Sequence, residues 1–237
     1  MELITTALVL VDISGYTKFI RQQKLSLLHA EDIITKLLET VLDTAQFPLI
    51  LNKLEGDAAF LYALIVDDPV PVLQDVTRQA VSFFSSFHNK ATELSLDTSY
   101  CGCDACTQID RLRLKIILHY GQVVIKKVRH YEELAGDNVI IIHQLLKNSV
   151  PAAEYLLMTQ PFFQAAGSIS GFQQETRTER YENFGQVAVE VFYPEASFTP
   201  RPIRRSFLRR LNLVVTRMLL YLRHFSGSSR SKEYDKW

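Results

Sequence analysis

The chain has 237 residues, enough for one large domain, or one domain with an appendage, around a sizeable core. Hydrophobic residues make up 47% and charged residues 22%, which is an ordinary globular mixture and excludes a wholly disordered chain or a coiled coil. No stretch approaches about 20 uncharged apolar residues, so no membrane span is expected. The N-terminus, MELITTALVLVDISGYTKF, lacks the basic segment of a signal peptide. The three cysteines are clustered, with no disulfide framework, which predicts a cytoplasmic protein.

The net charge of zero conceals an asymmetry. Residues 201–237 contain 10 Lys and Arg against 2 Asp and Glu, whereas the first 200 residues contain 16 against 24. We therefore expect an acidic domain over residues 1–195, then a linker and a basic amphipathic helix within 196–237. Such a helix is typical of attachment to an anionic membrane surface or an acidic protein partner; docking on the chain's own acidic body is the alternative. Nucleic acid is not an expected partner, because the basic stretch has few aromatic residues and no reading motif.

The predicted elements begin with a buried strand over residues 6–11, which ends at Asp12 before a turn at Gly15. Apolar residues at helical spacing predict a helix over about 29–45. Two strand-like runs, over 49–54 and 58–66, flank Glu55-Gly56-Asp57 and predict a hairpin. A second helix is expected to begin at Pro69 and Pro71.

A polar loop that contains the cysteines follows, and then two further strands over 112–119 and 122–128, expected to form a second hairpin around Tyr120-Gly121. A helix from Asp137 and strands over 155–158 and 186–193 complete the pattern. The order β-α-β-β-α-β-β-α indicates an α+β fold, with a ferredoxin-like, mostly antiparallel sheet flanked by helices.

Two carboxylates occupy matching points of this fold. Asp12 ends the first strand just before a helix, and Asp57 lies in the turn between the next two strands. In a β-α-β-β unit these strands are neighbours, so both carboxylates can converge on one hard cation such as Mg²⁺. The amides of residues 13–17 would face the same point from a turn and a helix N-terminus, which favours a phosphate. The alternative is that Asp12 is an N-cap and Asp57 an ordinary turn residue.

Four segments resemble the motifs of class III adenylate and guanylate cyclases. VLVDISGYTKF (9–19) is similar to that family's apolar run followed by Asp-Ile-x-Gly-Phe-Thr, and NKLEGDAAFLY (52–62) to its Lys-x-x-Gly-Asp hairpin. LKIILHYGQVVIKKV (114–128) resembles its apolar-x-x-His-x-Gly-x-Val hairpin, and LAGDNVIIIHQLLKNSVPAAEYLLMT (134–159) its Gly-Asp-x-Val-Asn helix and following strand. The segments follow the family's order over roughly residues 5–193, and the implied cyclase fold agrees with the predicted one.

The resemblance implies a role for each matching residue. Asp12 and Asp57 fall on the two catalytic, metal-binding aspartates, with the Ile13 carbonyl as a further ligand for Mg²⁺ or Mn²⁺. Lys53 and Glu133 fall on the two purine-reading positions, and a carboxylate at the second can accept from an adenine amine, which favours ATP. The alternative for Glu133 is a solvated loop acid. The nucleotide would also contact the turn after the first strand: Ile13, Ser14, Gly15, Tyr16 and Thr17.

Two positions depart from the family pattern. The asparagine that orients the ribose is replaced by Ile140, and the arginine that stabilises the transition state by Gln144. A guanidinium forks onto phosphate oxygens and neutralises developing charge, which a neutral glutamine cannot do. Lys147 or His143 could supply a substitute charge, although both also fit ordinary positions on a helix surface.

These features favour a homodimeric cyclase homology domain that binds a metal and a purine nucleoside triphosphate, with weak or altered conversion to the 3′,5′-cyclic nucleotide. One alternative is a catalytically degenerate nucleotide-binding or dimerising signalling module. Another is a membrane-surface adaptor that acts through its tail and cysteine loop, but such a protein has no chemical need for Asp12, Lys53 and Asp57 at matching positions.

The cysteine cluster suggests a second metal. Cys101, Cys103 and Cys106 are the chain's only cysteines, and three thiols in a loop suit Zn²⁺. A closed zinc site needs a fourth ligand, for which His88, Asp104 or a residue of a second chain is available. The alternative is three cytosolic thiols in a loop without a metal.

Overall fold

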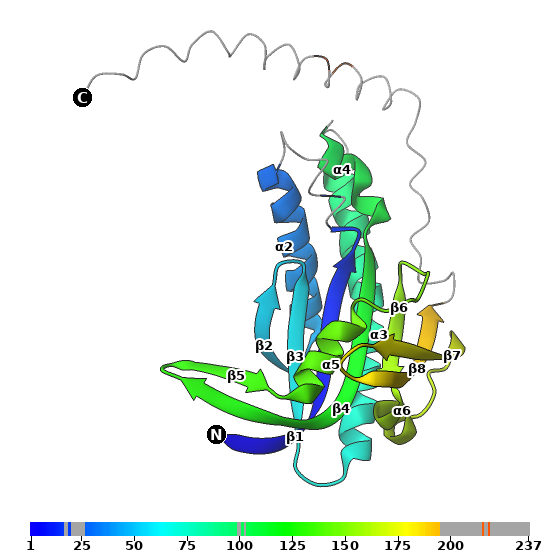
Figure 1. Cartoon of the computed structure of the whole chain (residues 1–237). Coiled ribbons are helices and arrows are strands. Elements are labelled where there is room, and N and C mark those ends of the chain that lie inside the picture. Colours follow the sequence, from blue (N-terminus) through cyan, green and yellow to red (C-terminus); the bar gives the residue numbers. More distant parts are fainter. Residues whose placement is uncertain are drawn as a thin grey trace, which may run out of the picture.

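A computed structural model describes residues 1–16, 19, 27–98, 101, 103–194, 215 and 218. In this part of the chain, an eight-stranded sheet has the order β2-β3-β1-β4-β6-β8-β7, and β5 pairs with β4 (Figure 1). Neighbouring strands are antiparallel except for β4 and β6, which are parallel. The strands are β1 (Glu2–Ser14), β2 (Ile50–Glu55), β3 (Ala58–Ile65), β4 (Arg113–Val128), β5 (Tyr131–Ala135), β6 (Tyr155–Thr159), β7 (Phe172–Tyr181) and β8 (Gly185–Pro194).

Helices cover both faces of the sheet. They are α2 (Leu27–Thr44), α3 (Pro69–Asp97), α4 (Asp104–Gln108), the 3₁₀ turn η1 (Ile109–Arg111), α5 (Asp137–Leu145) and α6 (Gln160–Ala166). Because side chains alternate along a strand, Val9 and Val11 of β1 join the core formed with α2, α3 and α6. Leu8 and Leu10 face the opposite way, into a smaller core with α5. The predicted α+β fold is confirmed.

The predicted hairpin around Tyr120-Gly121 is wrong. β4 runs unbroken through these residues, and the turn comes later, at Arg129-His130, between β4 and β5. The glycine serves a close approach, because a Cβ at Gly121 would lie 2.5 Å from Cγ of Asn138 on α5. A glycine inside a strand pattern therefore marks a close approach here, not a turn.

Two elements near the C-terminal end of the domain were not predicted, α6 and β7. β7 is exposed along most of its length and lies at the edge of the sheet, so its sequence lacks the apolar alternation that marks a half-buried strand.

The predicted tail helix and the domain boundary at 195/196 lie outside the described residues, apart from Val215 and Met218. No helix in the described ranges is long and apolar enough to cross a membrane.

Candidate functional site

The sheet brings Asp12 and Asp57 together. Asp12 lies near the end of β1, on the face that carries α5, and its register partners are Ala58 on β3 and Lys115 on β4. The Ile13 amide donates to the carbonyl oxygen of Asp57 (3.1 Å), which holds the β2–β3 turn against the end of β1. This amide is therefore already paired with the hairpin, whereas the sequence pattern had predicted that it faces a phosphate.

The electrostatics of this pair suit a divalent cation. Burial and the neighbouring Asp12 carboxylate raise the pKa of Asp57 to about 6, and burial also raises the pKa of Asp12. The Lys115 ammonium acts in the opposite direction on both pKa values. Two half-buried carboxylates that repel each other, beside the Ile13 carbonyl, are a set of hard oxygen donors, so these residues fit Mg²⁺ or Mn²⁺.

The turn after β1 brings a further acid to the site. Gly15 has a φ of 96°, and its carbonyl accepts from the Phe19 amide (2.9 Å), so a helical turn begins here. The Tyr16 hydroxyl donates to Oε1 of Glu31 on α2 (3.0 Å), and the Glu31 charge contributes to the raised pKa of Asp57. Nothing in the sequence pattern placed Glu31 in this site. Thr17 lies outside the described residues.

Lys53 belongs to a second group of polar side chains, together with Glu55 and His143. The sequence did not predict that either residue lies near Lys53. Its ammonium pairs with Glu55 (2.7 Å) and lies 5.9 Å from the centre of the Phe60 ring. Glu55 also contacts Nε2 of His143 (3.1 Å), whose Nδ1 lies 2.7 Å from the carbonyl oxygen of Val139. These two contacts hold the His143 ring between α5 and the β2–β3 hairpin.

The other predicted purine and transition-state positions lie along β5 and α5. Glu133 pairs across the β4–β5 hairpin with Lys126 (2.9 Å), and the same ammonium lowers its pKa. On α5, Ile140 is 48% exposed and Gln144 is partly exposed, and Lys147, just beyond the helix, is exposed. The positions where the family pattern has its asparagine and arginine thus carry two uncharged side chains, Ile140 and Gln144.

His119 and Asn138 form the contact that underlies the third and fourth motifs. His119 Nε2 donates to Asn138 Oδ1 (2.8 Å), and Asn138 Nδ2 donates to the carbonyl oxygen of Gln122 (2.7 Å). The second ring nitrogen accepts from the Thr159 hydroxyl (2.8 Å), and burial lowers the pKa of His119. These hydrogen bonds, made by a neutral imidazole, attach α5 to β4. His119 and Asn138 therefore position the helix against the sheet.

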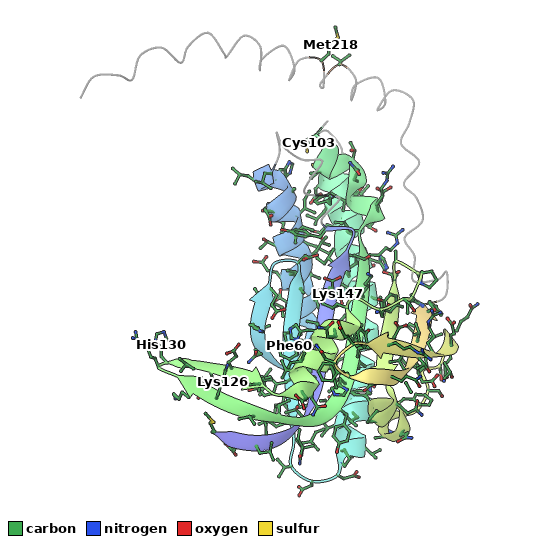
Figure 2. All side chains as sticks on the ribbon, in the orientation of Figure 1. Phe60, Cys103, Lys126, His130, Lys147 and Met218 are labelled. Carbon is green, nitrogen blue, oxygen red and sulfur yellow. The ribbon has the colours of Figure 1, made fainter. Side chains whose placement is uncertain are left out.

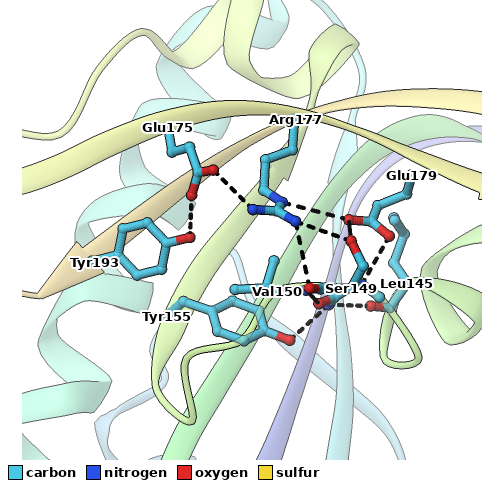
Figure 3. Close-up of polar contacts among 9 residues, drawn as sticks. Leu145, Ser149, Val150, Tyr155, Glu175, Arg177, Glu179 and Tyr193 are labelled. Carbon is cyan, nitrogen blue, oxygen red and sulfur yellow. Dashed lines mark hydrogen bonds and ion pairs between the residues drawn. The ribbon is translucent and has the colours of Figure 1, made fainter.

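A polar network, not indicated by the sequence, fastens the end of α5 to the edge of the sheet (Figure 3). Arg177 on β7 donates to the hydroxyl of Ser149 (3.1 Å), and the buried Glu179 accepts from the amide (2.9 Å) and hydroxyl (2.8 Å) of the same serine. Asn148 donates to the Tyr155 hydroxyl (2.7 Å). Tyr155 thus links this network to the central strands.

The cysteine cluster has a different fourth neighbour from those expected. His29, near the start of α2, contacts Cys101, Cys103 and Cys106, and the potential ligand atoms of the four all lie within 4.8 Å of one another. His88, one of the expected candidates, lies elsewhere: it is buried beside Glu154, with its Nε2 2.9 Å from the carboxylate. The side chain of Asp104 lies outside the described part of the structure.

The fold is similar to that of adenylyl and guanylyl cyclase catalytic domains. The adenylyl cyclase CyaB from P. aeruginosa superimposes with a TM-score of 0.63 at 11% identity, over 82% of this chain and 96% of that one. The guanylyl cyclase Cya2 gives 0.58 at 13% identity, over 86% and 98%. The guanylate cyclase domain of RhGC from Catenaria anguillulae, solved in complex with GTP, gives 0.58 at 13%, over 82% and 99%. At such identities the likeness concerns the fold.

The chain itself belongs to the DUF2652 family of proteins of unknown function, which it matches over residues 34–155. It is 34% identical over 162 residues to the uncharacterized protein Rv2561/Rv2562 of Mycobacterium tuberculosis, a match that covers 65% of this chain and 70% of that protein.

Proposed function

We propose that this chain binds Mg²⁺ or Mn²⁺ with a purine nucleoside triphosphate, ATP in preference to GTP, and converts it weakly or in altered fashion to the 3′,5′-cyclic nucleotide. The observation that carries the proposal is the convergence of Asp12 and Asp57 on one half-buried point. Both carboxylates and the Ile13 carbonyl would hold the metal. When bound, a divalent ion in this position activates the ribose 3′-hydroxyl and neutralises charge on the phosphates.

A homodimer would complete the site. The charges that act on Asp57 are Asp12, Glu31 and Lys115, whereas those that act on Glu55 and Glu133 are Lys53, His143 and Lys126. The two groups share no member. We infer that one nucleotide meets the carboxylates of one subunit and the Lys53 group of its partner. The half-exposed apolar side chain of Ile140, on the same helix as His143, suits a subunit contact.

The surface of α5 argues for slow chemistry. Without an arginine at position 144, the charge that develops on the phosphate oxygens has no bidentate donor, and loss of such a donor typically costs about 10²–10³ in rate. His143 is the basic side chain of this helix, but Glu55 and the Val139 carbonyl already contact its two ring nitrogens. This feature favours the alternative function, a cyclase-like domain that binds nucleotide or dimerises as a signalling module.

The first experiment measures binding and turnover separately. Wild-type protein is titrated with Mn-ATP and Mn-GTP by calorimetry, and the incubated mixtures are analysed by chromatography for cyclic products. Asp12→Ala and Asp57→Ala should each abolish metal-dependent binding and keep a native circular dichroism spectrum. Asp43→Ala, at an exposed acid on α2, is the matched control and should bind normally. Unchanged titration of Mn-ATP by either site variant would contradict the metal assignment.

The second experiment tests the shared site. Asp12→Ala and Lys53→Ala each remove one group, so neither homodimer should bind Mn-ATP fully. Mixing and re-equilibrating the two variants forms heterodimers in which one site carries both lesions and the other carries none. Recovery of binding on mixing supports a site made by two subunits, and absence of recovery in a dimer shown by light scattering excludes it.

A further inference from the structure

Four side chains from two distant segments bring one metal-ligating atom each to a common point. His29 comes from α2, near its start, and the three cysteines come from the segment between α3 and η1. Figure 2 shows Cys103 at the end of the molecule where α2 begins and α4 lies. At least 72 residues separate the histidine from each cysteine, so the fold brings them together.

The distances fit a tetrahedral ion. With Zn–S bonds of about 2.3 Å and Zn–N of about 2.1 Å, tetrahedral geometry separates sulfur from nitrogen by roughly 3.6 Å and two sulfurs by roughly 3.8 Å. His29 Nδ1 lies 3.5 Å from Sγ of Cys103, 3.5 Å from Sγ of Cys106 and 3.9 Å from Sγ of Cys101. The sulfurs of Cys103 and Cys106 are 3.3 Å apart, so only a small expansion is needed to admit an ion.

We propose that His29, Cys101, Cys103 and Cys106 form a structural Zn²⁺ site, separate from the metal site at Asp12 and Asp57. Thiolate and imidazole ligands select zinc over Mg²⁺ or Mn²⁺, which the carboxylates suit. Four protein ligands complete the coordination, so the ion has no open position for a substrate.

The surroundings of the cluster support a structural role. Cys106 is 2% exposed and belongs to the main core together with Ala105 and Ile109, so the site is continuous with the packed interior. The amide of Cys106 donates to Sγ of Cys103 (3.5 Å), a backbone contact that orients a ligand sulfur. The proposed ion therefore clamps the start of α2 to α4 and to the core beneath it.

By fixing the start of α2, the proposed zinc ion would also affect the proposed nucleotide site. Two residues after His29, α2 carries Glu31, which accepts the hydrogen bond from Tyr16 in the turn beside Asp57. Fixing the start of α2 thus fixes Glu31 and, through it, this turn. Only this consequence rests on the proposed function; the zinc site itself does not.

The test is the metal content of the full chain, purified under reducing conditions and measured by inductively coupled plasma mass spectrometry. We expect about one zinc per chain. Cys103→Ser, Cys106→Ser and His29→Ala should lower the content at least several-fold. His130→Ala, at an exposed histidine in the β4–β5 turn, is the control and should retain full zinc. His29→Cys should also retain zinc, because it restores a fourth ligand.

A second measurement covers variants that fail to fold. Wild-type protein stripped with a chelator should lose roughly 5 °C or more in Tm and regain it with Zn²⁺ but not with Mg²⁺. Co²⁺ added to the stripped protein should give the intense visible bands of tetrahedral thiolate coordination, shifted in His29→Cys. Zinc content no higher than in the triple Cys→Ser variant, bound iron in place of zinc, or a Cys103–Cys106 disulfide in the freshly purified protein would overturn the proposal. None of these readouts depends on nucleotide binding.

Discussion

Asp12 on β1 lies directly opposite Lys115 on β4, on the sheet face that carries α5. Lys115 in turn neighbours Tyr155 on β6, with its ammonium 5.8 Å from the ring centre. The lysine opposes the burial that raises the pKa of both Asp12 and Asp57, so it partly offsets the repulsion between the two carboxylates. The stability of this site and the proposed metal binding therefore depend on the same charges.

The first prediction concerns the pH dependence of stability. The pKa of Asp57 is raised from 3.8 to about 6, so the folded state holds this proton more tightly than the unfolded chain. The stability this provides is present below about pH 4 and is lost as the pH rises through about 6. Asp57→Asn, which cannot ionise, should exceed wild type by about 1 kcal/mol at pH 7.5, a figure discounted because the group is half exposed.

Urea unfolding of the metal-free proteins at pH 4 and pH 7.5 measures this difference, which should disappear at the lower pH. Asp43→Asn, at an exposed acid on α2, serves as the control and should show no such gain. Mn²⁺ should stabilise wild type but not Asp57→Asn. Equal stability of Asp57→Asn and wild type at pH 7.5 would contradict the prediction. It would mean that burial and the Asp12 charge do not destabilise the ionised Asp57 carboxylate in the folded state.

The second prediction concerns α5. If the rest of the site is competent, Ile140→Asn combined with Gln144→Arg should raise cyclase activity over wild type by roughly tenfold or more, because the pair restores a ribose contact and a bidentate cation. The product is measured by chromatography with Mn-ATP as substrate. Gln144→Lys with Ile140→Asn is the matched control, since it restores charge without the fork. No gain in a double variant that still binds nucleotide would show that the site is built differently from that of the cyclases.

The third prediction concerns the approach of α5 to β4. Gly121→Ala would place a Cβ 2.5 Å from Cγ of Asn138, whose side chain is held by His119 and the Gln122 carbonyl. We expect a loss of roughly 1–3 kcal/mol in the free energy of unfolding. Adding Asn138→Gly should remove the clash, so the double variant should be more stable than the sum of the single effects predicts. Strict additivity in this cycle would mean that the two residues do not press on each other.

The fourth prediction concerns the basic tail, residues 201–237. With 10 Lys and Arg against 2 Asp and Glu, it should attract anionic lipid by about 1 kcal/mol per basic residue near the surface, less at high salt. Co-sedimentation with anionic vesicles should therefore be salt-sensitive and lost in a chain that ends at Pro194. Neutral vesicles are the control. If the full chain stays in the supernatant and the truncated chain is insoluble, the tail is part of the fold or of the dimer.

Local signals in the sequence were sufficient for most of the fold. The hairpin over Asp57, the helices at Pro69 and Asp137 and the final strand all lie where they were predicted, within a few residues. The wrong hairpin prediction has a clear cause: Gly121 has the same sequence signal whether it turns the chain or admits Asn138 against a straight strand. The periodicity of apolar residues predicts which side of a segment is buried. It does not predict which element packs against that side.

The residues of the candidate site also fall into two sets, those that the sequence predicts and those that only the tertiary structure shows. The sequence by itself identified Asp12, Asp57 and the cysteines, because carboxylates at a strand end and clustered thiols carry their chemistry in the residue type. Only the tertiary structure decided that His29 and not His88 lies beside the three cysteines, and that Lys53 pairs with Glu55. These contacts join segments remote in the chain or depend on which way a side chain points across the sheet. Their physical cause is the packing of α2 and α5 on opposite faces, which no local pattern encodes.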